Sequence, residues 1–108
     1  MLKTVRIGQK DYDLKSSAYT MFGYKNHTGR ELLKDVSKLN RLQGQADQFE
    51  ALGELLEIAE QLAYVMYQEN KANPRISFEA FLEDMDGILE DIGWINDVIA
   101  LAMSTFRR

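Results

Sequence analysis

The sequence of 108 residues has no cysteine, a single proline and a single histidine, His27. Without cysteine the chain can form no disulfide, no thiolate nucleophile and no thiolate metal site, which suits a reducing cytoplasm. One imidazole without thiols also argues against zinc. The longest apolar runs, residues 62–67 and 98–103, have six residues each, whereas a membrane span needs about 20. We therefore expect no metal site and no membrane partner. The first ten residues contain no apolar stretch, so we also expect no signal peptide.

Catalytic motifs are equally scarce. The glycines form neither of the phosphate-binding patterns GxGxxG and GxxxxGK[ST]. The sequence around Ser16-Ser17 does not resemble that around a catalytic serine, so we interpret the pair as a helix cap. One acidic cluster lacks the spacing of a calcium loop, so we interpret it as solvated helix faces. Its members are Glu83, Asp84, Asp86, Glu90 and Asp91. We therefore expect no enzyme and no cofactor, and a hydrolase that uses an acidic pair is the least favoured alternative.

What the sequence does have is the composition of a folded protein with an uneven distribution of charge. Apolar residues make up 45% and charged residues 28%, which predicts one globular domain over residues 1–108. Residues 1–46 carry nine Lys/Arg against four Asp/Glu, a balance of +5, and residues 47–108 carry four against thirteen, a balance of −9. Either two solvated surfaces simply differ, or the basic part of one copy faces the acidic part of the next.

Apolar periodicity predicts the elements. Alternation on both sides of residues 8–10 predicts a β-hairpin over residues 1–15. Helical spacing then predicts a helix capped by Ser16 or Ser17 and ended by Gly29, and a second helix that starts at Thr28. Further helices are expected from Asp47 to about Asn70, after Ser77, and from about Ile88 to Phe106. The fold class is therefore mainly α, with a short N-terminal β-hairpin followed by four to five helices packed as a small bundle over residues 16–108.

The last predicted helix carries more apolar surface than one core stripe needs. Its principal stripe consists of Ile88, Ile92, Ile95, Ile99, Ala102 and Phe106, and a separate stripe consists of Trp94, Val98 and Leu101. Either other elements of the domain bury the second stripe, or it meets another subunit or a partner helix. In the second case Trp94 would be an effective anchor.

The basic N-terminal part offers an alternative function. Its positive residues are Lys25, Arg30, Lys34, Lys38 and Arg41, with Tyr19 and Tyr24 nearby. Such a segment suits a small regulatory or nucleic-acid-associated protein. The acidic remainder and the pI of about 5.0 argue against nucleic acid as the partner. The charge halves also mark Arg30, Lys34 and Lys38 as candidate contacts for self-association.

The order of the segments resembles a known family. The stretches KTVRIGQKDYDLK, SAYTMFGYK, TGRELLKD, LLEIAEQLAYVM and SFEAFLEDMD follow one another over nearly the whole chain. In this order, and at this length, they resemble the small tail assembly chaperones of long-tailed bacteriophages and prophages, the product made before a frameshift.

The resemblance implies a non-enzymatic role in the host cytoplasm, without a place in the mature virion. Such chaperones coat the long helical tape measure protein and hand over to the tail tube protein. They form weak homo-oligomers as rings or spirals, which need two different, complementary surfaces. The family also implies a longer frameshifted product, which the protein sequence cannot show. It supplies no catalytic residues.

Overall fold

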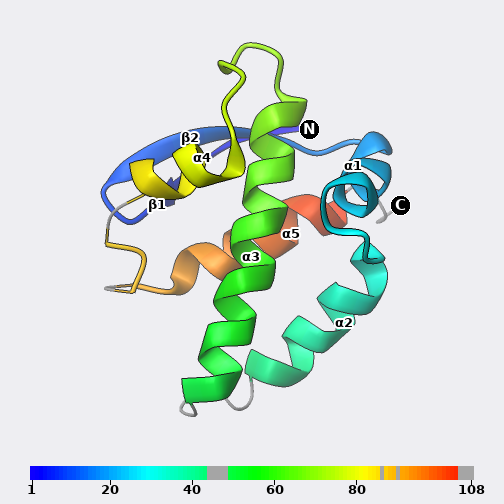
Figure 1. Ribbon diagram of the computed structural model, residues 1–108, viewed down its shortest axis with the longest axis vertical. Coiled ribbons are helices and arrows are strands. Elements are labelled where there is room, and N and C mark those ends of the chain that lie inside the picture. Colours follow the sequence, from blue (N-terminus) through cyan, green and yellow to red (C-terminus); the bar gives the residue numbers. More distant parts are fainter. Residues whose placement is uncertain (44–48, 86, 90, 105–108) are drawn as a thin grey trace.

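Helix α3 (Phe49–Glu69) lies at the centre of the protein, and the other elements surround it (Figure 1). The computed structural model describes residues 1–43, 49–85, 87–89 and 91–104. Along the described chain the elements are β1 (Leu2–Ile7), β2 (Lys10–Lys15), α1 (Tyr19–Thr28), α2 (Leu32–Gln43), α3, α4 (Phe78–Asp84) and α5 (Gly93–Ser104). The predicted class, mainly helical with an N-terminal hairpin, is confirmed.

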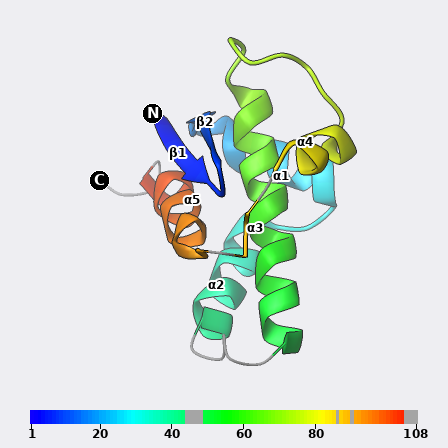
Figure 2. The same ribbon diagram turned by 90° about the vertical axis from the view of Figure 1, so that its left-hand side faces the viewer.

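The helices surround α3 at different angles instead of lying parallel as a bundle. Helix α3 contacts α1, α2, α4, α5 and strand β2. Figure 1 shows α5 crossing behind α3, and Figure 2 shows α5 beside the hairpin on one side of α3. Buried residues such as Leu55, Ile58 and Leu62 cover a wide arc of α3, and such an arc can contact several neighbours at once.

The hairpin forms as predicted. Strands β1 and β2 pair antiparallel with Val5 opposite Tyr12, and Gly8 in the turn has a φ of 63° that favours glycine. Alternate side chains face α3 and α5, so Val5, Ile7, Tyr12 and Leu14 are buried. A lone hairpin is marginal in water, and this packing supplies the stabilisation that it needs.

The two helix starts predicted near residues 16–28 differ in outcome. Ala18 lies at the cap position of α1 without a side-chain cap, but Ser17, one residue earlier, accepts a hydrogen bond from the Tyr19 N–H at 3.2 Å. Thr28 does not start α2, which begins at Leu32. Instead its hydroxyl donates to the Tyr24 carbonyl at 2.8 Å, within α1. Gly29 ends α1 with a φ of 76°, as predicted.

The later helices are mostly where the pattern placed them. Helix α3 ends at Glu69, and its predicted cap Asp47 lies outside the described residues. Ser77 caps α4 by accepting from the Ala80 N–H. Helix α5 begins at Gly93 and not near Ile88, because the side chain of Asp91 accepts from the Gly93 N–H at 2.8 Å.

Candidate protein-binding surfaces

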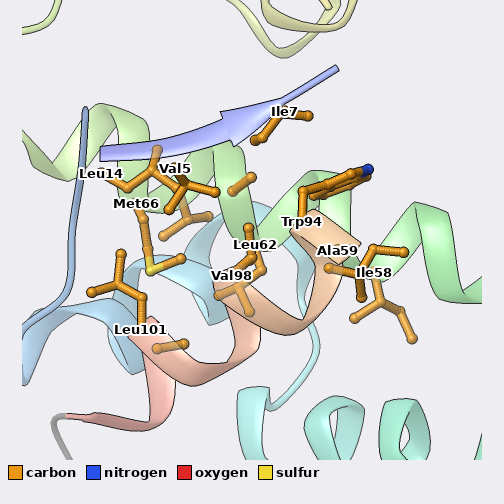
Figure 3. Close-up of a cluster of buried hydrophobic side chains, with 14 of the residues drawn as sticks. Val5, Ile7, Leu14, Ile58, Ala59, Leu62, Met66, Trp94, Val98 and Leu101 are labelled. Carbon is orange, nitrogen blue, oxygen red and sulfur yellow. The ribbon is translucent and has the colours of Figure 1, made fainter. Parts of the chain in front are cut away.

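The apolar stripe of the last helix lies in the core. Trp94 is 3% exposed, and Val98 and Leu101 are equally buried. Figure 3 shows the three side chains among residues of β1, β2 and α3. The indole N–H of Trp94 donates to the Ile88 carbonyl at 3.1 Å, so its polar atom is satisfied as well. The prediction of a partner surface at Trp94, Val98 and Leu101 is therefore wrong, because the hairpin and α3 bury this stripe.

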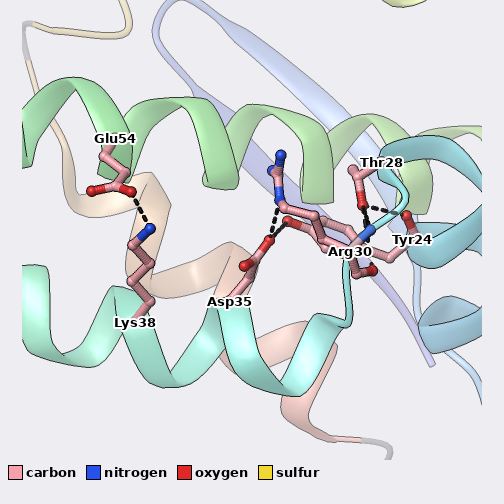
Figure 4. Close-up of polar contacts among 6 residues, drawn as sticks. All are labelled: Tyr24, Thr28, Arg30, Asp35, Lys38 and Glu54. Atoms are coloured by element: carbon pink, nitrogen blue, oxygen red, sulfur yellow. Dashed lines mark hydrogen bonds and ion pairs between the residues drawn. The ribbon is translucent and has the colours of Figure 1, made fainter.

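The basic candidate Arg30 belongs to a cluster that joins α1 to α2 (Figure 4). The carboxylate oxygen Oδ2 of Asp35 accepts from Arg30 Nε at 2.8 Å and from the hydroxyl of Tyr24 at 2.6 Å. Burial and the neighbouring Asp35 raise the pKa of Tyr24, so its hydroxyl remains a donor at neutral pH. Asp35 itself is buried, and a buried carboxylate needs such partners. The structure therefore gives Arg30 a role in the fold.

The other two basic candidates differ from each other. Lys38 forms an ion pair with Glu54 of α3 (Figure 4). Lys34 points into solvent and lies 3.7 Å from the carboxylate of Glu31. Arg30, Lys34 and Lys38 thus do not form one free cationic patch. Tyr24 is buried and cannot stack on a base, which weakens the nucleic-acid alternative.

Helix α1 turns small and polar residues towards α3. A Cβ atom at Gly23 would lie 3.2 Å from Cγ1 of Val65, so the two helices approach closely there. The hydroxyls of Ser17 and Thr20 both donate to the carboxylate of Glu69, the latter at 2.7 Å. Because these contacts fix the inner face, Tyr19 and Phe22 of α1 face outwards, whereas Tyr24 is buried.

The outer face of α1 and the start of α2 enclose an apolar groove of about 560 Å³. We call it the α1–α2 groove, and its lining consists of Ala18, Met21, Phe22, Lys25, Asn26, Glu31, Leu32 and Leu33. Phe22 is 60% exposed and Leu33 51% exposed. Tyr19 extends the apolar surface, with its ring 5.6 Å from that of Phe22. Sequence reasoning missed this groove, because helical apolar spacing does not show which residues of a helix the other elements cover.

A second exposed apolar surface precedes α5. Leu89 is 63% exposed and Ile92 is 37% exposed. The exposed carboxylate of Asp91 lies between them in the sequence, and that of Asp97 follows in α5. We call these four residues the acidic surface. A hollow of about 460 Å³ includes Asp91 and Asp97 in its lining, beside Arg6 of β1. Residues 76–104 contain seven Asp/Glu and no Lys/Arg.

A third hollow, of about 570 Å³, lies between α1 and the end of α3. His27 and Glu69 are part of its lining. The imidazole packs against the rings of Tyr64 and Phe78, and burial lowers the pKa of His27 although Glu79 opposes the shift. Both carboxylate oxygens of Glu69 accept hydroxyl hydrogen bonds. These groups are engaged in packing and fold contacts, which gives no indication of a nucleophile held by a base.

The remaining observations concern an acidic residue of α3, metal binding and membrane crossing. Burial and the neighbouring Glu57 raise the pKa of Glu60 on α3, but neither residue lines the three hollows described above. Within the described ranges, the acidic and histidine side chains form no group of three or more that could hold a metal ion. No helix in the described part of the chain is both long and apolar enough to cross a bilayer.

Comparisons with protein-family models, curated proteins and solved structures found nothing that matches the chain.

Proposed function

We propose that the protein is a non-enzymatic phage tail assembly chaperone that binds the tape measure protein and aids tail tube assembly through self-association. The observation that carries the binding role is the α1–α2 groove, where Phe22 and Leu33 remain exposed beside Tyr19. Monomeric proteins rarely leave large contiguous apolar surface in water, and such surface is typical of contacts with other proteins. Aromatic side chains at its centre are the usual anchors.

The named partners come from the sequence resemblance. A tape measure protein is long and helical, so its apolar faces require cover until the tail tube surrounds it. A small domain with an exposed apolar groove and no need for catalysis suits that task. The tail tube protein and weak rings or spirals of the chaperone itself belong to the same proposal.

The test is coexpression with the tape measure protein of the same phage or prophage. We expect the soluble fraction of the tape measure protein to rise several-fold and the two proteins to copurify. A coexpressed helical protein of similar acidity controls for general effects on expression. An unchanged soluble fraction, with the chaperone itself soluble and folded, would refute the proposal.

A further inference from the structure

We propose that the hollow between α1 and the end of α3 binds a small molecule that carries a phosphate group and a flat ring, the chemistry of a mononucleotide. We call it the α1–α3 hollow, and its lining includes Lys15, Gly23, His27, Tyr64, Lys71 and Arg75. This lining shares no residue with that of the α1–α2 groove. The inference therefore goes beyond the proposed function and does not depend on it.

The hollow has the dimensions of a small-molecule site. Its volume of about 570 Å³ lies within the range of about 300–1,000 Å³ that is typical of such sites. Its lining comes from the end of β2 with the turn that follows, from α1, and from the end of α3 with its connection to α4. Figure 1 shows α1 beside the end of α3 and the connection to α4 above it. A ligand in the hollow would therefore contact segments that lie far apart in the sequence.

Three cationic side chains line the hollow. They are Lys15 of β2, and Lys71 and Arg75 of the connection between α3 and α4. All three residues are exposed, and none of them takes part in an ion pair within the part of the chain that the structure describes. Cations elsewhere, such as Arg30 and Lys38, are paired with carboxylates. Unpaired ammonium and guanidinium groups around a concave site favour the binding of an anion.

Hydrogen bonds hold the connection that carries two of these cations. The side-chain amides of Asn70 and Asn73 donate to the carbonyl of Asp13 on β2, at 3.2 and 2.8 Å. The hydroxyl of Tyr64 on α3 donates to the carbonyl of Ile76 at 2.7 Å. These contacts tie the connection to both β2 and α3, so the two cations extend from a fixed backbone. Preorganisation of this kind lowers the entropic cost of binding.

The charges of the lining favour a dianion. The carboxylate of Glu69 also lines the hollow, and the hydroxyls of Ser17 and Thr20 donate to its two oxygens. Three positive groups and this one negative group leave an excess of two positive charges. A phosphate monoester is close to a dianion at pH 7, because its second pKa is about 6. A single carboxylate on a ligand would neutralise only half of the excess.

Aromatic side chains form another part of the lining. The ring of Tyr19 lies over Gly23, with one ring carbon 3.0 Å from where a Cβ atom of Gly23 would be. The ring centroids of His27 and Tyr64 are 4.9 Å apart. Because burial lowers the pKa of His27, its imidazole is neutral at pH 7. The flat ring of a ligand can stack on such groups whatever its substituents, so the site suits a nucleotide better than a bare phosphate ion.

The surroundings disfavour a protein as the occupant. The exposed apolar side chains of Phe22 and Leu33 belong to the α1–α2 groove, and Tyr19 is the one large exposed apolar side chain within the described lining of the hollow. Protein interfaces have an apolar centre with a polar rim. A concave site that combines a few rings with a few charged groups is typical of small-molecule binding.

Equilibrium dialysis of the full chain with adenosine 5′-monophosphate tests the proposal. Inorganic phosphate, which lacks the ring, and adenosine, which lacks the phosphate, are measured at the same ionic strength. We expect the nucleotide to bind at submillimolar concentration. Both partial ligands should bind at least about tenfold more weakly, because each loses either the charged hydrogen bonds or the stacking contact. Equal affinities for the nucleotide and inorganic phosphate would overturn the proposal, and so would the absence of binding at millimolar nucleotide.

Two variants locate the site, and a matched variant controls for total charge. Lys71→Gln and Arg75→Gln each remove a cation from the lining, whereas Lys34→Gln removes one from α2, where 79% of the side chain is exposed. We expect about a tenfold loss of nucleotide affinity for each of the first two and none for the third. Circular dichroism without ligand should show three folded proteins, since none of these side chains belongs to the core. Equal affinities of the three variants would overturn the site.

Competition separates a small molecule from nucleic acid. A short single-stranded oligonucleotide without a terminal phosphate carries only singly charged phosphodiesters. We therefore expect it to displace the bound nucleotide less well than free adenosine 5′-monophosphate does at the same concentration. Stronger displacement by the oligonucleotide would overturn the assignment to a small molecule.

Discussion

Two aromatic residues, Trp94 and Phe22, differ in burial in a way that their sequence patterns do not determine: Trp94 is 3% exposed and Phe22 is 60% exposed. Helical spacing showed which residues share a face but not which element covers that face. The hairpin lies about 90 residues before Trp94 in the chain, and no local pattern announces that it packs there. Phe22 has ordinary helical spacing, but the contacts of Thr20 and Gly23 rotate it outwards.

This difference in burial predicts a large effect on stability of one alanine substitution and a small effect of another. Trp94→Ala should lower the free energy of unfolding by about 3–5 kcal/mol, because it leaves a cavity in the core. Phe22→Ala should change it by less than about 0.5 kcal/mol, because Phe22 is exposed. Urea denaturation followed by far-ultraviolet circular dichroism measures both. A marginal effect of Trp94→Ala would show that the indole is not part of the core.

The hydroxyl of Tyr24 provides a second test within the folded monomer. Tyr24→Phe removes one donor from the buried carboxylate of Asp35 and should cost about 1–3 kcal/mol of stability. Tyr19→Phe is the matched control, since Tyr19 is about half exposed and its substitution should be nearly neutral. Equal urea midpoints for both variants would contradict a stabilising role of the cluster.

His27 should make stability depend on pH. Its pKa is lowered in the folded protein from an unfolded value of about 6.5. The unfolded chain therefore takes up the proton first as the pH falls, so stability is lost below about pH 6.5 until the folded pKa is passed. His27→Gln should reduce the difference in urea midpoint between pH 7.5 and pH 5.5. An unchanged difference would assign the acid sensitivity to carboxylates instead.

Among the elements, the contact of α1 with α3 is the one that glycine makes possible. In Gly23→Ala the new methyl group would meet Val65 and the ring edge of Tyr19, and overpacking of this kind costs about 1–3 kcal/mol. Gly53→Ala is the matched substitution at an open position of α3 and should add about 0.5–1 kcal/mol. Thermal melts of the two variants should therefore shift in opposite directions. Two shifts of the same sign would contradict the close approach.

The elements themselves could largely be predicted from the sequence, and their faces could not. Alternation identified the hairpin, and helical apolar spacing identified α3, because both signals are local. The start of α5 was missed because Ile88 and Ile92 continue the helical spacing, whereas Asp91 ends the irregular segment by capping at Gly93. The candidate site depended on the outward face of α1, which follows from the long-range contact of Glu69 with Ser17 and Thr20.

For the whole molecule, the separation of charge predicts association that weakens with salt. At an ionic strength of 1 M the Debye length falls to about 3 Å, so charges across a wet contact are largely screened. Light scattering at fixed protein concentration should show smaller species as sodium chloride is added. Species that grow with salt would show that apolar contacts alone drive association.

The packing of the first strand on the last described helix has a consequence for the timing of folding. Strand β1 contacts α5, and the hydroxyl of Ser16 donates to the carbonyl of Ala102. During synthesis at about 5–20 residues per second, the buried face of the hairpin lacks its cover until residues 93–104 have left the ribosome. At that rate, Val5 and Ile7 of the nascent chain remain without the cover of α5 for several seconds. Contacts so distant along the chain also slow folding itself.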